Sequence, residues 1–498
     1  MDLFHNLIFG FGVAFSLQNV FYCFVGSLLG TLVGVLPGIG PLATIAMLLP
    51  LTFKVPPVAA LIMLAGIYYG AQYGGSTTSI LVNLPGETSS VVTCIDGYQM
   101  ARQGRAGPAL AISAIGSFFA GTICTLIVAL FGPPIAEVAL KFGAPEYFSL
   151  MLMGLVTAAV LSQGDMSKSL AMVALGLLLG IVGTDVESGV KRFAFDINEL
   201  ADGISFVTLG VGVFAVGEII SNLGDPEVRS IFTSKVKNLM PTWEDLKQSF
   251  LPIVRGTGLG AFFGVLPGTG PAIASFSSYM LEKKVAKDPS RFGHGAIEGV
   301  AGPEAANNAD AQCKFIPMLT LGIPASAVMA LMLGAMMIQG IAPGPQVMVK
   351  NPDLFWGLIA SMWIGNLMLL VLNLPLVGLW VYMLKVPYRL LFPAIMVFSS
   401  IGIYAVNNSE FETYLAGAFG AVGFLWMKLE CPPAPMLLGF VLGPMLEENL
   451  RRALLLSRGD PSVFFTRPIS LAFMIATILI LLTMALPAVR KRRDEITD

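Results

Sequence analysis

The chain has 498 residues, of which 55% are hydrophobic and only 12% charged, with a net charge of −2 and a mean hydropathy of +0.78. Soluble domains carry roughly 25% charged residues, so the composition excludes an ordinary soluble protein and a soluble enzyme. Nothing in the charge balance suggests a nucleic-acid partner. A helix needs about 20 apolar residues to cross a bilayer. Stretches without Asp, Glu, Lys or Arg run over residues 6–53, 55–86, 106–136, 256–281, 315–349, 354–384 and 468–489.

The first of these stretches is too long for one span. Pro37, Pro41 and Pro50 interrupt it, so it must hold more than one element. The segment 3–16 is expected to form an interfacial helix or a first partial span, because no basic cluster opens it as in a signal peptide.

A glycine- and proline-rich motif, Gly-Val-Leu-Pro-Gly-x-Gly-Pro, occurs at residues 34–41 and again, 230 positions later, at residues 264–271. A broken backbone at membrane depth is tolerated only where it is packed in protein or lines a cavity. Two such breaks in corresponding halves of a chain are typical of the binding site of a transporter built from repeats.

Shorter matches in the same order extend the similarity between the halves. The segment 83–86 matches 322–325, and the segment 103–108 resembles 339–345. Near the end of each half, a glycine-rich apolar stretch closes on an acid, Glu218 or Glu447. An ordered series of this kind predicts two structural repeats.

The predicted organisation has five parts: an N-terminal segment at 1–19, membrane repeat 1 at 20–223, a polar linker at 224–250, membrane repeat 2 at 251–455, and a C-terminal span with a basic tail at 456–498. The fold class is therefore all-α, a polytopic membrane protein with about 10–12 transmembrane helices, including broken helices or re-entrant hairpins.

The positions of the basic residues indicate how the repeats are oriented. The tail at 490–493 and the cluster at 283–291 are assigned to the cytoplasmic side. Where one repeat is rich in basic residues, the equivalent position of the other repeat has few. This opposite bias predicts that the two repeats are inverted relative to each other. The arginines between 451 and 467 do not fit this assignment.

The backbone of the duplicated motif suggests a site for an anion. Glycine and proline break the helical ladder and leave free N–H groups at the start of the next half-helix, where the dipole favours negative charge. The tip residues predicted to bind substrate are Pro37, Gly38, Gly40, Pro267, Gly268 and Gly270. The alternative is helix kinking and close packing through Gly26, Gly30 and Gly34 and their second-half counterparts.

Hydroxyl and amide side chains amid apolar residues supply further candidates, because neutral oxygens suit Na⁺ and carboxylates alike. Those assigned to substrate, with two loop residues, are Ser76, Thr77, Thr78, Asn83, Gly86, Asn307, Asn308, Pro324 and Ser326. Those assigned to a cation, with two acids and one glycine, are Ser79, Glu87, Thr88, Glu304, Thr320 and Gly322. Interhelical hydrogen bonding is the competing interpretation.

Intramembrane acids are costly and therefore functional by default. Glu87, Glu304 and Asp310 stand beside the polar runs. Lys314 follows Asp310 by four residues, a helical spacing that permits a local ion pair.

Catalytic and metal chemistry find little support. The five cysteines are scattered without metal or disulfide spacing, and each is interpreted as a small packing residue. His5 and His294 lack partners at metal-ligand spacing. No cofactor is predicted, and the protein is not expected to be an enzyme.

Several motifs resemble one family, the large membrane subunit of tripartite tricarboxylate transporters (TctA family). They lie at residues 26–38, 69–76, 83–87, 96–104, 303–308, 319–324, 439–443 and 447–452. The resemblance covers nearly the whole chain. It departs at Asp310-Ala-Gln-Cys-Lys314, where the family usually has small residues.

The resemblance implies a permease in the bacterial inner membrane that works with a small four-helix membrane subunit and a periplasmic solute-binding protein. It would take up a citrate-like carboxylate by alternating access of elevator type, driven by an ion gradient for which Na⁺ is the expected ion. The alternatives are an ion or solute channel, or a carrier for a different organic anion.

Overall fold

The computed structural model describes residues 3–36, 40–162, 165–185, 187–222, 239–266, 268–383 and 388–485. Within them almost all regular structure is helical, and the strands form one short antiparallel pair, β1 (Gly183–Thr184) with β2 (Lys191–Arg192). The predicted all-α class is confirmed. Most of the predicted linker (223–238) and the basic tail (486–498) lie outside the described residues.

The helices before the linker are α1 (Leu3–Ala14), α2 (Leu17–Val35), α3 (Pro41–Thr52), α4 (Pro57–Val82), η1 (Thr88–Ser90), α5 (Val91–Arg102), α6 (Ala106–Ala139), α7 (Ala144–Leu161), α8 (Met166–Gly180), η2 (Asn198–Leu200), α9 (Phe206–Gly210), η3 (Val211–Val216) and α10 (Gly217–Asn222). The segment η3 is a π-helix that continues α9 into α10.

The helices after the linker are α11 (Trp243–Val265), α12 (Pro271–Val285), η4 (Pro289–Arg291), α13 (Glu298–Cys313), α14 (Phe315–Leu321), α15 (Ala327–Ile338), α16 (Val347–Lys350), α17 (Pro352–Asn373), α18 (Val377–Met383), α19 (Tyr388–Asn407), α20 (Glu410–Lys428), α21 (Pro433–Leu456), α22 (Val463–Thr466) and α23 (Pro468–Ala485).

Several helices have the length and composition of membrane spans. In the described part of the chain, α2, α6, α7 and α17 are long and apolar enough to cross a membrane, and six further apolar helical segments are shorter. Large apolar side chains such as Phe21 on α2, Phe131 on α6 and Phe262 on α11 are exposed. The chain is therefore a multi-pass membrane protein; the number of crossings stays a prediction.

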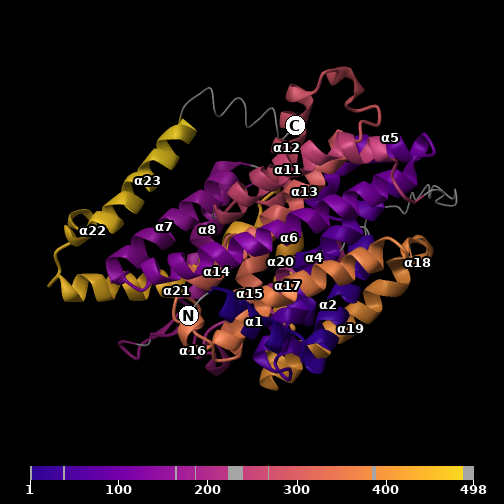
Figure 1. Cartoon of the computed structure of the whole chain (residues 1–498). Helices are drawn as coiled ribbons and strands as arrows, with labels where there is room; N and C mark the ends of the chain where they lie inside the picture. The colour runs from indigo at the N-terminus through magenta and orange to yellow at the C-terminus, as the bar shows by residue number, and fades with distance from the viewer. Residues whose placement is uncertain are drawn as a thin grey trace.

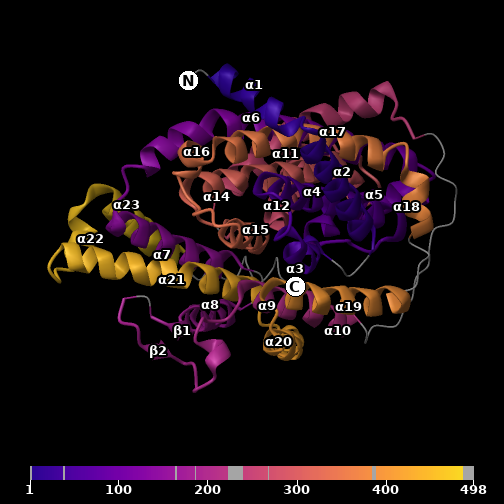
Figure 2. The same ribbon diagram turned by 90° about the horizontal axis from the view of Figure 1, so that it is seen from below.

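The helices form two layers, which separate clearly in Figure 2. One, the hairpin layer, contains α1–α6 and α11–α17; the other, the second layer, contains α7–α10 and α19–α23 (Figures 1 and 2). Much of the contact between them passes through α3, which packs on α19 and η3, and through α15, which packs on α21.

The most extensive helix pair in the first half is α2 on α4. A Cβ atom added at Gly26, Gly30 or Gly34 would lie 2.2–2.4 Å from a carbonyl oxygen of α4. Glycines of α4 approach the backbone of α2 in return. Only residues without a Cβ allow this approach, so the close packing considered from the glycine spacing is confirmed.

The second half repeats this pair with α11 on α13. A Cβ at Gly256, Gly260 or Gly264 would lie 2.2–2.5 Å from the carbonyl oxygens of Gly302, Ala306 and Asp310 respectively. The equivalent contacts in the first half go to Met63, Ile67 and Ala71. Spacing and contact geometry therefore match between the two pairs, residue by residue.

Each half also packs on the other in a reciprocal way. Helix α6 of the first half lies along α13, whereas α17 of the second half lies along α4. Gln103, which ends α5, donates to the carbonyl oxygen of His294 in the loop between α12 and α13 (2.8 Å). Gln339, which ends α15, donates to Thr52 O (2.6 Å) and Val55 O (3.2 Å) in the turn between α3 and α4.

A buried carboxylate strengthens the contact between α5 and the loop that joins α12 to α13. Asp96 of α5 is fully buried, and its Oδ1 accepts hydrogen bonds from the backbone N–H groups of Gly293 (2.9 Å), Gly295 (2.7 Å) and Ala296 (2.8 Å). Tyr279 donates its hydroxyl to Oδ2 at 3.0 Å. Charge-assisted bonds of this kind are about twice as strong as neutral ones, so Asp96 fastens the loop between α12 and α13 to α5.

An ion-pair network fastens the hairpin β1–β2 to α21. Arg192 pairs with Asp185 (2.7 Å) and Glu447 (2.9 Å), and Arg451 pairs with the same two acids (3.1 and 2.6 Å). Hydrogen bonds from Ser188 and Arg192, with that from Arg451, hold the pKa of Asp185 well below its ordinary value. Glu447 lies within α21.

Replacing Gly260 with alanine should destabilise the protein by about 1–3 kcal/mol, because the new methyl group would overlap Ala306 O and the Cβ of Ala309. Gly258 of the same helix is exposed, and a methyl group added there would have no atom within 4 Å. Gly258→Ala should be neutral or stabilise by at most ~1 kcal/mol. Thermal unfolding of the purified variants in detergent would compare them; equal unfolding temperatures would contradict the packing argument.

Asp185→Asn should loosen the hairpin at neutral pH. Because the folded-state pKa lies below the ordinary value of about 3.9, the stabilisation is present above that value and is lost as pH falls through the folded pKa. Wild-type protein should therefore keep Arg192 protected from trypsin at neutral pH. Asp202→Asn, on the same loop but exposed, is the control. Equal cleavage rates for the two variants would argue against the network.

Candidate functional site

The duplicated motif interrupts the helical backbone in both halves, as predicted. Helix α2 ends at Val35 and α3 begins at Pro41, whereas α11 ends at Val265 and α12 begins at Pro271. The predicted tip residues Pro37, Gly38 and Pro267 lie outside the described residues.

The helix that follows each interruption starts in the same way. Gly40 and Gly270 have extended backbones (φ −77°, ψ 172° and φ −92°, ψ 156°) and are followed by a proline in the first helical position. As glycines, Gly40 and Gly270 have no side chain of their own that could cap the helix. Free N–H groups and the helix dipole favour an anion there. The carboxylate of Glu218 on α10 lies near the N–H of Gly40.

The second tip is packed between the layers. Gly268 has φ +81°, its N–H donates to Ala325 O at 2.9 Å, and an added Cβ would lie 2.3 Å from the Cα of Ala158 on α7. Glycine is required there by both conformation and space. Gly270, two residues later, has open space where its Cβ would be.

The loops at 83–87 and 322–326 share a backbone conformation. Asn83 (φ 57°) and Gly322 (φ 70°) are left-handed and end α4 and α14. Glu87 (φ −149°, ψ 167°) and Ser326 (φ −154°, ψ 170°) are extended and begin the next helix. Between them Gly86 packs on Gly34, and Pro324 is buried.

Glu304 joins three helices of the hairpin layer. Its Oε2 accepts a hydrogen bond from Ser76 of α4 (2.6 Å), and its Oε1 accepts one from Thr93 of α5. All three side chains are buried. Among the described residues no lysine or arginine forms an ion pair with Glu304. Its carboxyl group is therefore partnered by hydroxyl groups rather than by a basic side chain.

Glu87 forms a second acidic group beside the first. It accepts hydrogen bonds from Ser89 and from Nδ2 of Asn307 (3.2 Å). The other amide atom, Oδ1 of Asn307, is buried without a hydrogen-bond partner in the described chain. Asn308 turns toward α6 and donates to Ser117 Oγ at 2.7 Å. Of the predicted amides, Asn307 thus faces the acids and Asn308 faces a neighbouring helix.

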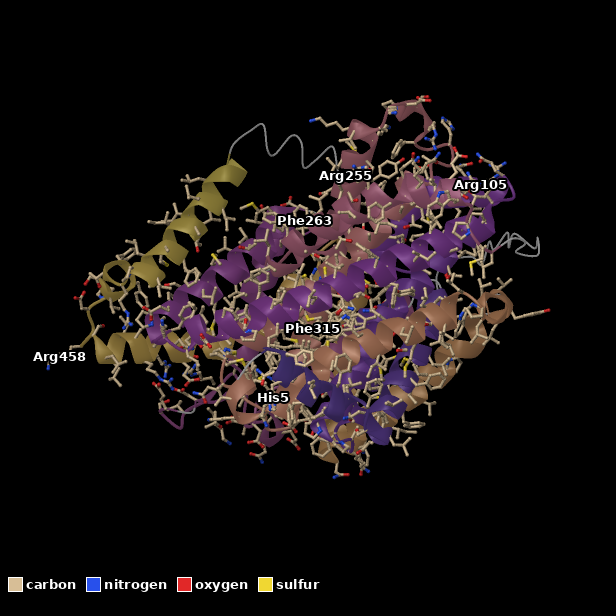
Figure 3. The ribbon with its side chains drawn as sticks, viewed as in Figure 1. His5, Arg105, Arg255, Phe263, Phe315 and Arg458 are labelled. Carbon is tan, nitrogen blue, oxygen red and sulfur yellow. The ribbon has the colours of Figure 1, made fainter. Side chains whose placement is uncertain are left out.

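The predicted ion pair between Asp310 and Lys314 is confirmed, and both side chains are fully buried. Phe315, the next residue, lies in the middle of the bundle (Figure 3). The second carboxylate oxygen of Asp310 has no hydrogen-bond partner among the described residues. This pair and the two acidic groups give the middle of the hairpin layer three carboxylates and one ammonium group.

Most of the other predicted hydroxyls bond to backbone groups. Those of Thr77, Thr78 and Thr320 donate to backbone carbonyls, and Ser326 caps the first turn of α15. Thr88 is exposed on η1, whereas Ser79 is buried in α4.

Sequence reasoning missed several polar residues near the acids. Thr93 donates a hydrogen bond to Glu304, and Ser117 accepts one from Asn308. Polar side-chain atoms of Tyr69, Gln72 and Tyr73 on α4 are buried without hydrogen-bond partners in the described chain. Such atoms cost roughly 1–3 kcal/mol each unless water or a ligand satisfies them. The sequence feature that could have identified them is the run Tyr-Tyr-Gly-Ala-Gln-Tyr within an otherwise apolar helix.

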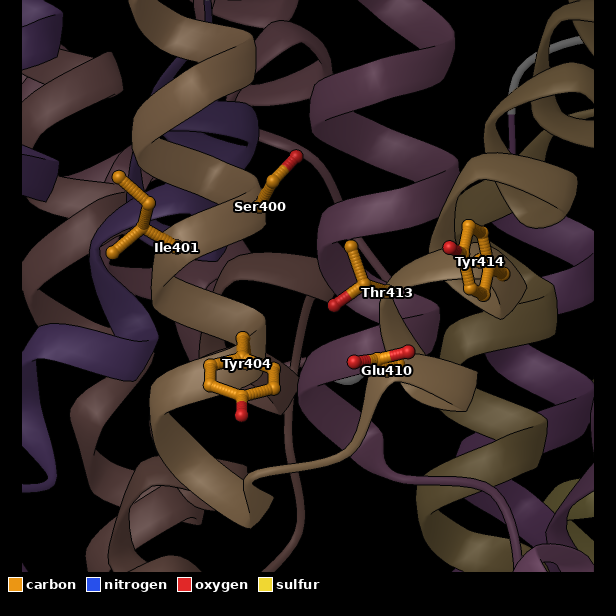
Figure 4. Close-up of a pocket in the computed structure, with 6 residues that line it drawn as sticks. All are labelled: Ser400, Ile401, Tyr404, Glu410, Thr413 and Tyr414. Atoms are coloured by element: carbon orange, nitrogen blue, oxygen red, sulfur yellow. The ribbon is translucent and has the colours of Figure 1, made fainter.

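A separate pocket of about 400 Å³ lies between α19 and α20 (Figure 4), lined by Ser400, Ile401, Tyr404, Glu410, Thr413 and Tyr414. It includes none of the predicted site residues. Because its lining is mainly apolar and comes from the second layer, it does not extend the acidic site. No cluster of three metal-ligand side chains occurs in the described chain either.

Comparison with known proteins gives two close relatives, both from Agrobacterium vitis. One, named "Uncharacterized 52.8 kDa protein in TAR-I ttuC' 3'region", is 58% identical over 496 residues, which is all of this chain and 99% of the relative. The other, named "Uncharacterized protein in TAR-II ttuC' 3'region", is 57% identical over 237 residues, 48% of this chain and 98% of the relative. No solved structure is significantly similar.

A family model described as "Tripartite tricarboxylate transporter TctA family" matches residues 20–438. The match spans both helix interruptions, both loops and the buried acids. It agrees with a multi-pass helical protein and with a transport function. The chain therefore belongs to the tripartite tricarboxylate transporter TctA family.

Proposed function

We propose that this chain is the large permease subunit of a binding-protein-dependent secondary transporter for a citrate-like tricarboxylate or related carboxylate. It would act in the bacterial inner membrane with a small four-helix membrane subunit and a periplasmic solute-binding protein, and a Na⁺ gradient would drive uptake. The observation that carries the proposal is the pair of matching helix interruptions, each followed by an uncapped helix start. Such breaks bind substrate in repeat-built transporters.

The two halves are proposed to be inverted repeats. Support comes from contacts between the equivalent helices α4 and α13. Ser76 bonds to Glu304, whereas the ring of Tyr69, earlier in α4, contacts the tilted ring of Phe315, just after α13 (5.9 Å between centroids). The two helices thus run in opposite directions. The reciprocal contacts of Gln103 and Gln339 fit a two-fold relation between the halves.

Substrate carboxylates would bind at the starts of α3 and α12. The protein's own Glu218 carboxylate lies near the N–H of Gly40, so a carboxylate group already stands beside this helix start. Gly268 brings the second tip against α7. Gly40 and Gly268 therefore both lie beside residues of the second layer, and a substrate held there would lie between the two layers.

The coupling cation would bind beside Glu87 and Glu304. Their carboxylates are partnered by hydroxyl and amide groups, and Oδ1 of Asn307 is an additional oxygen without a partner in the described chain. Neutral and anionic oxygens are the ligands that hard cations prefer.

Alternating access would move the hairpin layer against the second layer as a rigid body. The close backbone contacts of α2 with α4 and of α11 with α13 lie within the hairpin layer, whereas contacts between layers are concentrated on α3 and α15. A layer that is tightly packed within itself and loosely joined to its neighbour suits an elevator-type displacement.

Gly268→Ala should reduce uptake of labelled citrate into proteoliposomes at least about tenfold, because left-handed strain and overlap with Ala158 cost ~1–3 kcal/mol each. The proteoliposomes hold this chain and its small partner, with the binding protein added outside and an inward Na⁺ gradient. Gly270→Ala, with free space for the methyl group, should keep wild-type uptake.

Full uptake by the Gly268 variant would overturn the tip assignment. Wild-type uptake that does not depend on the binding protein and does not saturate with substrate concentration would indicate a channel. Saturable uptake of another organic anion, but not of citrate, would correct the substrate, and uptake without a Na⁺ gradient would correct the coupling ion.

Glu304→Gln should preserve the fold but weaken Na⁺ activation. The glutamine keeps the shape of the side chain, and the hydroxyls of Ser76 and Thr93 can turn to accept its N–H groups. Loss of the charge should raise the Na⁺ concentration for half-maximal uptake by about tenfold or more. Glu298→Gln, at the start of the same helix and paired with Arg291, should leave it unchanged. Identical Na⁺ curves for wild type and Glu304→Gln would exclude Glu304 from the cation site.

A further inference from the structure

We infer that Asp310 and Lys314 form an exchangeable ion pair: one substrate carboxylate takes Lys314, and the coupling cation bound beside Glu87 neutralises the Asp310 that is released. The inference rests on the proposed function and assigns a role to two residues that it leaves unused. Lys314 is the only lysine or arginine among the described residues that is fully buried, and Asp310 is buried with it.

The fold itself does not require these charges. In α11–α13, Gly264 packs on Asp310; in α2–α4, Gly34 packs on Ala71 in the same manner. The residue four positions after Asp310 is Lys314, and the residue four positions after its first-half equivalent Ala71 is Gly75. The first half therefore builds the equivalent helix pair with an alanine and a glycine.

The energetic cost of the pair also points to a function. Removing two charges from water costs several kcal/mol per ion, and the attraction between them offsets this only with good additional hydrogen bonds. Here Oδ1 of Asp310 has no hydrogen-bond partner in the described chain. An energetically costly, incompletely satisfied pair inside a membrane protein is expected to take part in transport.

The surroundings of the pair fit an exchange. Asp310 packs on Gly264, which stands one residue before the end of α11 and so lies beside the second helix interruption. Glu87, in the loop proposed to hold the cation, accepts a hydrogen bond from Asn307, one helical turn before Asp310 on α13. An arriving carboxylate can satisfy the ammonium group in place of Asp310. Asp310 would then be an uncompensated buried charge, which a cation neutralises. Substrate and cation thus favour each other's binding, which is the reciprocity that coupled transport needs.

The decisive variant removes both charges. Asp310→Asn with Lys314→Met should fold, since replacing a buried pair with neutral residues is often tolerated, yet citrate uptake should fall roughly 10- to 100-fold, the worth of a charged hydrogen bond. Lys314→Met alone should lose uptake similarly. The control is the exposed pair four residues apart on α21, Glu448→Gln with Arg452→Gln, which should transport normally.

If the pair only stabilises the fold, the double variant should restore the uptake that Lys314→Met loses, and the inference would be overturned. Asp310→Asn alone gives a second readout in the purified full chain. Its thermal stabilisation by citrate should persist while the additional effect of Na⁺ disappears; loss of the citrate effect, or an unchanged Na⁺ effect, would also overturn the inference. Wild-type protein that transports none of the tested carboxylates would instead refute the proposed function.

Discussion

The approach of helix backbones at glycine is the constraint on which the rest of this structure depends. Helix α2 lies directly on α4, and α11 on α13, because no Cβ atoms separate them at the contacts. The two pairs hold the ends of α2 and α11 in defined positions. The interrupted segments that follow, and the buried polar side chains of α4 and α13, are therefore presented by rigid elements rather than by flexible loops.

The same packing explains why charges are tolerated in the hairpin layer. Ser76, Thr93 and Asn307 are brought to Glu304 and Glu87 from three helices, so the carboxylates find donors without a basic residue. Asp310 and Lys314 provide the opposite solution, with one charge neutralising another on the same helix. A site with both kinds of group can respond to an anion and to a cation, which a uniformly charged site cannot do.

Much of the architecture could be predicted because its causes are local. The duplicated glycine-proline motif marks both interruptions, and Asn83 and Gly322, four residues before Glu87 and Ser326, end their helices in the same left-handed conformation. The four-residue spacing predicted the pair of Asp310 with Lys314. By contrast, the bond from Thr93 to Glu304 spans 211 residues, and the bonds to Asp96 span about 200. Such partners depend on how the halves meet, which no pattern within one segment records.

The hydrogen bonds between Asp96 and the loop that joins α12 to α13 have a consequence for biogenesis. Asp96 is synthesised long before Gly293, Gly295 and Ala296, the residues whose N–H groups solvate its buried carboxylate. Until the second half leaves the ribosome, Asp96 must stay in contact with water or lipid headgroups, and α5 cannot settle into its final position. We therefore expect α5 to reach its final position only after the loop between α12 and α13 has been made and inserted.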